Sequence, residues 1–366
     1  MTALIALSLC IWLYLVFAHG KFWAAGPRLP PAVPPQVPTV DIIVPARDEA
    51  ATIGRVIASL LAQDYAGEFR ILLIDDDSSD GTAQCAGAAP RLEIIRGKPK
   101  PAGWSGKLWA VQQGIAAGSA PLLLLTDADI THDPRHLAAL VARLLDARVD
   151  LVSEMVHLNC ESFAERALVP AFVYFFQMLY PFARVNDPRS RVAAAAGGTI
   201  LLRREALERI GGIEAIKGAL IDDVALARAV KPGGGVYLGH SVLAASIRPY
   251  PRFGDLWRMI SRTAFTQLRY SGAWLVLTVL ALALVWLVPV WAMAAGHPAE
   301  RAMGLAAFTL AAASYLPTLR SYRRGRAWAL ALPLIALFYM AATVGSAVNH
   351  WRGTGARWKS RAYGAG

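Results

Sequence analysis

Long uncharged apolar runs near both ends of the chain restrict its possible folds more than any other feature of the sequence. One run is Thr2–Ala18, and three more are Ala273–Ala295, Met303–Leu319 and Ala327–Val348. A helix needs about 17 to 25 apolar residues to cross the hydrocarbon core of a bilayer. The sequence therefore predicts a membrane protein whose middle region, between these runs, folds in water.

The charges that flank the runs predict the orientation of the chain. No Lys or Arg precedes the first run, whereas Lys21 and Arg28 follow it. A cleaved signal peptide begins with a basic segment, so a retained N-terminal anchor is favoured over a signal peptide. Lys21, Arg28 and the Arg-rich loop 320–326 all favour the cytoplasmic side. The basic tail, residues 351–366, then requires one C-terminal run to be re-entrant or interfacial, so the number of spans stays open.

The formal charge of +11 suggests a nucleic-acid partner only at first sight. In a membrane protein, basic residues gather near anionic headgroups and in cytoplasmic loops. The chain carries no zinc-finger or RNP pattern, and we expect no nucleic-acid partner. Cys10, Cys85 and Cys160 are far apart, with no metal-binding or disulfide spacing, as expected in a reducing cytoplasm.

Strand-like and helix-like segments alternate between about residues 39 and 250. The predicted strands are Val40–Pro45, Phe69–Ile74, Leu92–Ile95 and Pro121–Leu125, and the predicted helices are Glu49–Gln63, Gly81–Ala89 and Ser105–Ala117. This alternation is typical of an α/β fold with parallel strands and helical crossovers. In such sheets the ligand binds beyond the carboxyl ends of the strands.

Acidic clusters follow three of the four predicted strands, in Pro45–Glu49, Asp75–Gly81 and Thr126–Asp129. Helix capping explains one such cluster, because Asp and Ser are favoured N-caps. Three adjacent carboxylates at 75–77 exceed what a cap requires, and like charges repel unless a cation or hydrogen-bond donors meet them. The clusters therefore indicate a ligand site at this edge of the sheet.

Asp127 and Asp129 form the sharpest of these signals. In an extended chain, residues i and i+2 point to the same side, so both carboxylates can reach one cation. Mg²⁺ and Mn²⁺ take one or two carboxylates together with substrate phosphate oxygens. The sequence predicts that these two residues hold a divalent metal, Mg or Mn.

The motifs together resemble family 2 glycosyltransferases with the GT-A fold. The resemblance rests on Ile43–Glu49, Ile74–Gly81, Asp127–Asp129 and Ile221–Val224, in this order, and covers about residues 40–269. It implies a mixed, mainly parallel sheet with N- and C-terminal transmembrane helices around it.

The flanking segments narrow this resemblance. The membrane runs look like the ceramide-glucosyltransferase-like membrane branch of that family. The segments Gly103–Trp109 and Trp257–Ser271 look like the hopene-associated glycosyltransferases of hopanoid-producing bacteria. The resemblance implies a lipid acceptor, with a hopanoid as the candidate, and a nucleotide-diphosphate sugar as donor, most simply a UDP-sugar.

The resemblance also assigns the donor site. The implied nucleotide-sugar-binding residues are Pro45, Arg47, Glu49, Asp76, Lys107, Asp127, Ala128, Arg258 and Arg262, and the implied metal ligands are Asp129 and Asp127. A solvated surface lysine is the alternative for Lys107, and contact with lipid headgroups is the alternative for Arg258 and Arg262. Relatives commonly have Gly or Asn where this chain has Asp77, so the shape of that loop is open.

The proton acceptor is implied to lie in Asp222-Asp223. Asp223 is the expected general base, since a second carboxylate beside it raises its pKa, and the reaction inverts the anomeric configuration. The alternative is that both residues only cap a helix over Val224–Val230. Gly197 and Gly198 are expected to border the acceptor, or else to form a tight turn before a strand.

The predicted organisation has five parts: an anchor (1–20), a Pro-rich linker (21–38) that is stiff rather than folded, a cytoplasmic catalytic domain (39–271), membrane or re-entrant helices (272–350) and a basic tail (351–366). Leu168–Phe182 is either a buried core helix or an interfacial helix that faces lipid. The expected location is the bacterial inner membrane, multi-pass. A polyprenyl-phosphate sugar transferase, a nucleotidyltransferase and a non-enzymatic lipid-binding protein are the alternatives, although a nucleotidyltransferase would want glycine in the loop after the first strand.

Overall fold

The computed structural model describes residues 1–353, 357–358 and 361–362, and the chain divides into two compact units. The helical unit combines Met1–Gly26, Cys160–Ala183 and Tyr250–Ala356. The sheet unit combines Pro27–Asn159 and Arg184–Pro249 with the C-terminal residues. The predicted basic tail lies partly outside the described residues, Lys359 among them.

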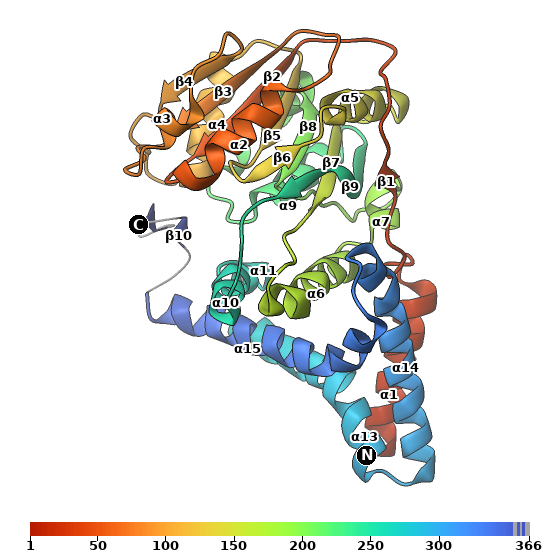
Figure 1. The fold of residues 1–366 in the computed structure, drawn as a ribbon. Helices are drawn as coiled ribbons and strands as arrows, with labels where there is room; N and C mark the ends of the chain where they lie inside the picture. Colours follow the sequence, from red (N-terminus) through yellow and green to blue (C-terminus); the bar gives the residue numbers. More distant parts are fainter. Residues whose placement is uncertain (354–356, 359–360, 363–366) are drawn as a thin grey trace. The chain divides into compact units, whose positions relative to one another are not determined.

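A nine-stranded sheet is the centre of the sheet unit (Figure 1). Its strands are β1 (Arg28–Leu29), β2 (Val40–Ala46), β3 (Phe69–Asp75), β4 (Leu92–Arg96), β5 (Leu122–Thr126), β6 (Ile130–His132), β7 (Leu151–His157), β8 (Thr199–Arg203) and β9 (Val236–Ser246). The order is β1-β9-β7-β8-β5-β2-β3-β4, and β6 pairs with β9. Parallel pairs join β2 to β3 and β5, β3 to β4, and β9 to β1 and β7, whereas β8 is antiparallel to both neighbours. The sheet is therefore mixed and mainly parallel, as predicted.

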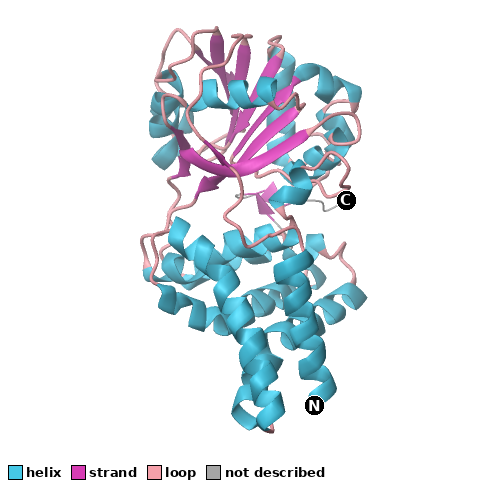
Figure 2. Ribbon diagram, turned by 90° about the vertical axis from the view of Figure 1, so that its right-hand side faces the viewer, coloured by secondary structure: helices cyan, strands magenta, loops and turns pink. Residues whose placement is uncertain are grey.

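Helices flank this layer of strands (Figure 2). They are α2 (Ala50–Leu61), α3 (Thr82–Ala86), α4 (Gly106–Ala117), α5 (His136–Asp146), α8 (Arg204–Arg209), the 3-10 turn η1 (Ile213–Ile216) and α9 (Asp222–Val230), while α7 (Phe182–Asn186) includes residues of both units. The strands and helices predicted between residues 40 and 126 all form, with ends that differ by a few residues.

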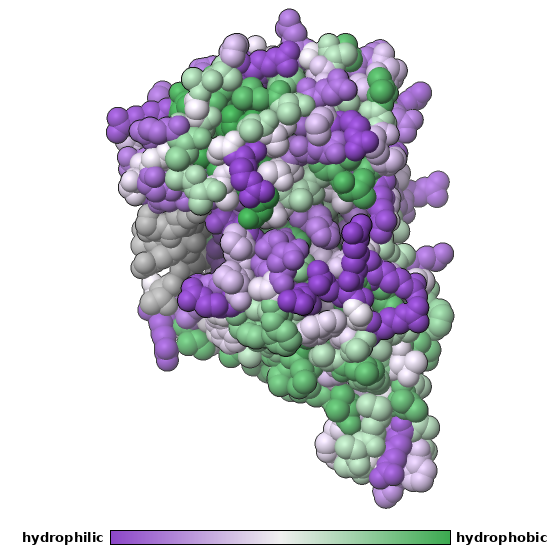
Figure 3. All heavy atoms as spheres, in the orientation of Figure 1, coloured by the Kyte–Doolittle hydropathy of each residue, from purple (hydrophilic) through white to green (hydrophobic). Residues whose placement is uncertain are grey.

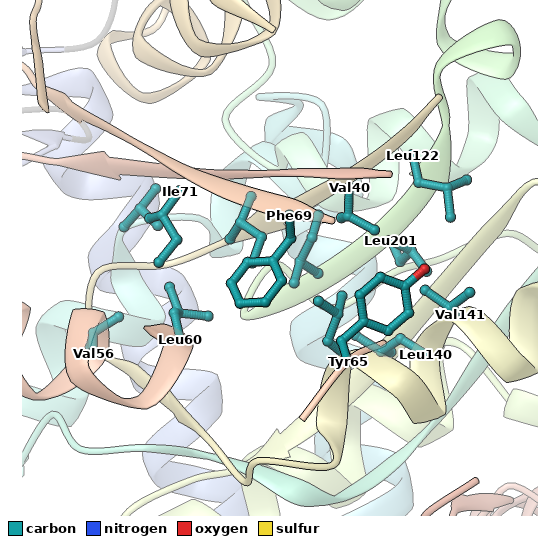
Figure 4. Packing of buried hydrophobic residues seen from close by; sticks show 14 of the residues in the cluster. Val40, Val56, Leu60, Tyr65, Phe69, Ile71, Leu122, Leu140, Val141 and Leu201 are labelled. Atoms are coloured by element: carbon teal, nitrogen blue, oxygen red, sulfur yellow. The ribbon is translucent and has the colours of Figure 1, made fainter. Parts of the chain in front are cut away.

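Apolar side chains from β2, β3 and β5 meet those of α2 and α5 in one core (Figure 4). Val40, Phe69 and Leu122 come from the strands, and Leu60 and Leu140 from the helices. The alternation of strand and helix produces this arrangement, because each amphipathic crossover helix must cover the sheet with its apolar face.

The Pro-rich stretch differs from the prediction at one point. Arg28 and Leu29 form β1, which pairs with His240 and Ser241 of β9, and Leu29 is fully buried. The prediction that this stretch is unfolded is wrong for these two residues. An edge strand tolerates flanking prolines because only one of its sides needs hydrogen bonds.

The helical unit holds the apolar runs. Its helices are α1 (Thr2–Ala18), α6 (Phe163–Leu179), α10 (Phe253–Ser261), α11 (Ala264–Gln267), α12 (Gly272–Leu282), the π turn η2 (Ala283–Leu287), α13 (Val288–Ala295), α14 (Pro298–Ser321), the 3-10 turn η3 (Arg326–Ala331) and α15 (Leu332–Trp351). Gly272–Ala295, Pro298–Ser321 and Arg326–Trp351 are long and apolar enough to cross a membrane, and α1 is shorter. Large apolar side chains such as Trp274 and Leu334 are exposed on these helices. Hydrophobic residues form much of the surface of the helical unit in the view of Figure 3.

Two segments distant in sequence pack against these apolar helices within the helical unit. From α1, Trp12 donates its ring N–H to the Val285 carbonyl, 3.0 Å away. From α6, the Tyr174 hydroxyl lies 2.7 Å from Ser314 Oγ, and Tyr174 is fully buried. These contacts favour a buried helix over an interfacial helix for α6. Residues 250–271 also belong to the helical unit, and the predicted catalytic-domain limit at residue 271 stays a prediction.

Candidate functional site

The carboxyl ends of β2, β3 and β5 meet at one edge of the sheet because these strands are parallel neighbours. The three acidic clusters of the sequence therefore share this edge. The Asp127–Asp129 segment is a turn between β5 and β6, closed by the Ile130 N–H on the Asp127 carbonyl at 3.2 Å. The expectation of an extended segment is wrong, but the turn still leaves the Asp129 charge close enough to raise the pKa of Asp127, after the larger effect of burial.

A pocket opens beside this edge. Its polar lining comes from Lys107, Asp127, Asp222, Asp223 and Gly197, joined by Thr126. The rest of its wall is apolar: Pro45, Leu108, Val111, Leu125, Ile200, Ile213, Ile216 and Leu226. The structure thus brings together one cation, three carboxylates and a glycine turn that are spread over residues 107–223 of the sequence, within largely apolar walls.

Lys107 is the central cation of the pocket. It opens α4, whose N-cap Ser105 accepts the Leu108 N–H at 3.2 Å. Its Nζ lies 2.9 Å from Asp127 Oδ1 and 3.0 Å from Asp222 Oδ2, so it is not a solvated surface lysine. Burial disfavours its charged form, but the surrounding carboxylates hold the pKa of Lys107 well above its ordinary value. Lys107 therefore stays cationic and ties the acidic turn to α9.

Asp223 is the carboxyl group best suited to accept a proton. Burial, together with the negative charge of Asp222, raises the pKa of Asp223 to about 7, against the opposing effects of Lys107 and two backbone donors. Those donors are the Gly197 N–H to Oδ2 and the Val224 N–H to Oδ1, each at 2.8 Å. Helix capping alone does not explain the side chain, since its Oδ2 bonds a different element. A pKa near neutral pH is what a general base requires.

Gly197 approaches both functional groups closely. A Cβ atom at this position would lie 3.4 Å from Asp223 Oδ2 and 3.5 Å from Lys107 Nζ. Gly197 and Gly198 precede β8, so the interpretation as a turn before a strand also holds. A turn before β8 and a border to the acceptor are therefore both compatible with the structure at Gly197 and Gly198.

Arg248 is a site residue that the sequence analysis missed. Its Nε lies 2.5 Å from Asp129 Oδ2, and its Nη2 lies 2.5 Å from Glu49 Oε1. It follows β9, which pairs antiparallel with β6 just after the acidic turn. Only this pairing brings Arg248 to the clusters, and no local sequence signal marks it.

The first two acidic clusters are joined by Arg47. Its guanidinium pairs with Asp76 at 3.6 Å and also donates to the Asp76 carbonyl, and the Asp76 side chain is buried. Asp77, next to it, has a φ of +59°, the left-handed conformation that Gly and Asn adopt most easily. The loop therefore keeps the backbone shape that glycine would allow, although Asp stands there.

The structure does not gather all the predicted donor-site residues. Ala128 is buried in the core, so its side chain does not line the pocket wall. Arg258 lies on α10 of the helical unit, where Asp255 Oδ1 is 2.5 Å from its Nη2, and Arg262 follows the same helix. The phosphate-binding role of these two arginines stays a prediction.

The carboxylate groups of Asp127 and Asp129 could supply only some of the ligands that a divalent metal needs. The described residues contain no group of three or more His, Cys, Asp or Glu that could hold a metal ion. Asp127 and Asp129 nevertheless form an acidic pair, and a cationic side chain faces each of them, Lys107 and Arg248. One or two carboxylates suffice for Mg²⁺ or Mn²⁺ when substrate phosphates complete the shell.

Residues 41–211 match the family described as Glycosyl transferase family 2. An N-acetylglucosaminyltransferase of Rhizobium leguminosarum bv. viciae is 30% identical over 159 residues, which is 40% of this chain and 37% of that protein. The succinoglycan biosynthesis protein ExoU of Rhizobium meliloti is 35% identical over 108 residues, 28% of this chain and 30% of that protein. The chain thus spans about a third of the length of these two curated relatives.

One solved structure is similar over nearly the whole chain. The mannosyltransferase PcManGT from Pyrobaculum calidifontis, in complex with GDP-Man and Mn²⁺, aligns with a TM-score of 0.57 and 20% identity, covering 97% of this chain and 100% of that one. This likeness confirms the predicted fold.

Proposed function

We propose that this chain, whose residues 41–211 form a glycosyl transferase family 2 domain, transfers a sugar from a nucleotide-diphosphate sugar to the hydroxyl group of a lipid. The observation that carries the proposal is the position of Asp223. Its carboxylate lines the pocket, is held by two backbone donors, and has a pKa raised to about 7. Asp223 takes the proton of the acceptor hydroxyl, which makes the oxygen a better nucleophile.

The donor binds at the acidic edge of the sheet. Pro45, Arg47 and Asp76 lie on the nucleotide side, and Lys107 meets the diphosphate as a partly buried cation. Asp127 and Asp129 would hold a divalent metal, which when bound would supply Lewis-acid stabilisation of the negative charge on the leaving nucleoside diphosphate. The structural relative in complex with GDP-Man and Mn²⁺ supports a nucleotide sugar and a metal at this fold. With Asp223 as the base, the acceptor oxygen displaces the nucleoside diphosphate in one step, so the reaction inverts the anomeric centre.

The acceptor is a lipid, and a hopanoid is the candidate that the sequence resemblance suggests. The pocket wall beside Asp223 carries Ile213, Ile216 and Leu226, which suit an acceptor with hydrocarbon next to its hydroxyl. Three helices long enough to cross a membrane support a multi-pass protein of the bacterial inner membrane with its sheet unit in the cytoplasm. A polyprenyl phosphate would use the same donor site and differ only in the acceptor.

The test is transfer of labelled sugar by the full chain in lipid vesicles. The protein is incubated with Mn²⁺ or Mg²⁺, a panel of labelled nucleotide sugars, and hopanoid or polyprenyl phosphate in the bilayer. Label extracted with hopanoid, and lost in Asp223→Asn and Asp129→Asn, supports the proposal. The matched control is Asp146→Asn, whose carboxylate is 79% exposed and remote from the pocket lining.

Each other outcome has a defined meaning. If label is found on polyprenyl phosphate alone, the proposed acceptor is wrong and becomes polyprenyl phosphate, while the proposed donor site stands. Normal transfer by both Asp variants refutes the site assignment. Lipid binding without transfer of any sugar refutes the enzymatic proposal in favour of a lipid-binding protein.

A further inference from the structure

A chain of buried polar side chains runs through the sheet unit up to the pocket, where Thr126 belongs to the lining, and the proposed chemistry does not use it. We call it the buried polar chain, and its members are Glu154 of β7, His136 of α5, His132 of β6 and Thr126 of β5. Glu154 Oε2 lies 2.7 Å from His136 Nε2, His136 Nδ1 lies 2.8 Å from His132 Nδ1, and His132 Nε2 lies 3.1 Å from Thr126 Oγ1. All four side chains are at most 5% exposed. Buried polar groups are costly unless they are satisfied, so their hydrogen atoms can be counted.

The hydrogen bond made by Thr126, at one end of the buried polar chain, fixes the direction of the other hydrogen bonds in it. Thr126 Oγ1 is 2.9 Å from the carbonyl oxygen of Gly198, which can only accept, so the single hydroxyl hydrogen points there. His132 Nε2 must then donate to Thr126. Burial and the neighbouring His136 hold the pKa of His132 well below its ordinary value, so His132 is neutral and its Nδ1 accepts from His136.

The hydrogen count gives the charge of the chain. One proton lies on His132 Nε2, one between the two Nδ1 atoms, and one between His136 Nε2 and Glu154. Three protons over two imidazoles and one carboxyl group give a net charge of zero. The chain is thus neutral, and its hydrogen bonds from His136 onward all point toward Gly198.

The turn at the end of the buried polar chain carries a contact of the proposed base. Gly197, next to Gly198, donates its N–H to Asp223 Oδ2 at 2.8 Å. On the other side, Ser153 Oγ accepts the Ala196 N–H at 2.9 Å and lies 3.1 Å from the Thr199 carbonyl. Residues 196–199 are therefore held by hydroxyl groups of the two strands that flank β8.

We infer that the buried polar chain positions the Gly197–Gly198 turn and, through it, the carboxylate of Asp223. The inference rests on the proposed function for its catalytic consequence, but not for the position of the turn. Its members are positioning residues, since in the described structure they act on Asp223 only through the turn. Without the Thr126 anchor, the Gly197 N–H is free to leave Oδ2, and the base loses one of its two backbone donors.

The test pairs a disruptive variant with a conservative one at each end of the chain. Thr126→Val removes the terminal hydroxyl, whereas Thr126→Ser keeps it. Glu154→Leu removes the hydrogen-bond partner of His136 at the other end of the buried polar chain. Glu154→Gln keeps a partner there, because the amide can donate to His136 Nε2 and leave both imidazoles neutral. The control is Asp41→Asn, which alters another buried carboxylate, paired with Arg70 at 2.6 Å and with Arg204 at 3.2 Å, toward the end of β5 and β8 opposite the turn.

The first measurement is hydrogen exchange of amides 196–199 by mass spectrometry on the full chain in lipid nanodiscs. Thr126→Val and Glu154→Leu should accelerate this exchange about tenfold, while both conservative variants and Asp41→Asn leave it unchanged. Since exchange needs no substrate, it tests the position of the turn even where the wild type transfers no sugar, a result that would count against the proposed function alone. If Glu154→Leu does not fold, the Thr126 pair decides the question.

The second measurement is the pH dependence of kcat for sugar transfer. A carboxylate that accepts several backbone N–H groups has its pKa lowered by roughly one unit for each. In the disruptive variants the acid limb should therefore move up from about 7 by about one pH unit and kcat at pH 7 should fall about fivefold, with KM for the donor nearly unchanged. Asp222 and Lys107, the charged groups that face Asp223, are the same in all variants.

Three results would overturn the inference. One is unchanged exchange and an unchanged acid limb in Thr126→Val. Another is a Glu154→Gln variant as defective as Glu154→Leu, which would mean that the negative charge matters rather than the hydrogen bonds of the buried polar chain. The third is a shift of the acid limb in Asp41→Asn equal to that in Thr126→Val.

Discussion

The acid limb of the reaction should move in opposite directions when the two charges beside Asp223 are removed one at a time. Asp222 raises the pKa of Asp223 and Lys107 lowers it. Asp222→Asn should therefore shift the midpoint of the acid limb below about 7, and Lys107→Met should shift it above. The base is active when deprotonated, so activity is lost as the pH falls through this midpoint.

The size of the shift follows from Coulomb's law. Two carboxylates on the order of 6 Å apart repel by about 3 kcal/mol at an effective dielectric constant of about 20, and by about 0.7 kcal/mol in water. One pKa unit corresponds to about 1.4 kcal/mol, so the shift for Asp222→Asn lies at roughly 0.5 to 2 units. The partial burial of Asp223 favours the middle of that range.

The assay is single-turnover sugar transfer at saturating donor between pH 5 and 9, so that weaker donor binding in Lys107→Met does not distort the profile. Asp146→Asn serves again as the exposed control. Shifts in the same direction for both variants, or no shift in either, would refute the assignment of the acid limb to Asp223. A wild-type profile flat across pH 6 to 8 would do so as well.

Four further outcomes follow from the structure. Asp77→Gly should raise the unfolding free energy by about 0.5 to 1 kcal/mol in chemical denaturation, because glycine adopts a φ of +59° without strain; a loss of stability would show that the Asp77 side chain contributes more than its backbone costs. Arg248→Met should lower the unfolding free energy by about 1 to 3 kcal/mol, because it leaves Glu49 and Asp129 without the cation between them, and wild-type stability would mean that the pair is dispensable. Leu201→Ala should lower it by about 2 to 5 kcal/mol, since Leu201 is fully buried in the core, and a smaller loss would indicate that the core collapses around the cavity. Chelation with EDTA should abolish sugar transfer and added Mn²⁺ should restore it, whereas transfer that persists in EDTA would rule out the metal.

Much of the fold could be predicted from local sequence. The strands after residues 40, 69 and 121 are continuous buried runs, and the turn residues between them mark where each element ends. The apolar runs predicted the long helices for the same reason, because length and composition alone decide whether a segment can cross a bilayer. β1 was missed, since two residues among prolines carry no periodic signal.

The site could be predicted only in pieces. The sequence placed Asp127 among the candidates because it follows a strand, where ligands bind in parallel sheets, and the family resemblance added Lys107 and Asp223. It could not show that Lys107 bridges Asp127 and Asp222, or that Arg248 joins Asp129 to Glu49. Those ion pairs join residues from 20 to 199 positions apart, and no local pattern encodes them.

The sequence by itself determined the kinds of element, their order, and the acidic edge of the sheet, because these depend on residue periodicity and on the chemistry of neighbouring residues. The tertiary structure alone decided the protonation properties. Burial of Asp223 beside Asp222, opposed by Lys107 and the Gly197 N–H, sets its pKa. Desolvation and charge pairing depend on distances across the fold, so a carboxylate becomes a base suited to neutral pH only once the chain has folded around it.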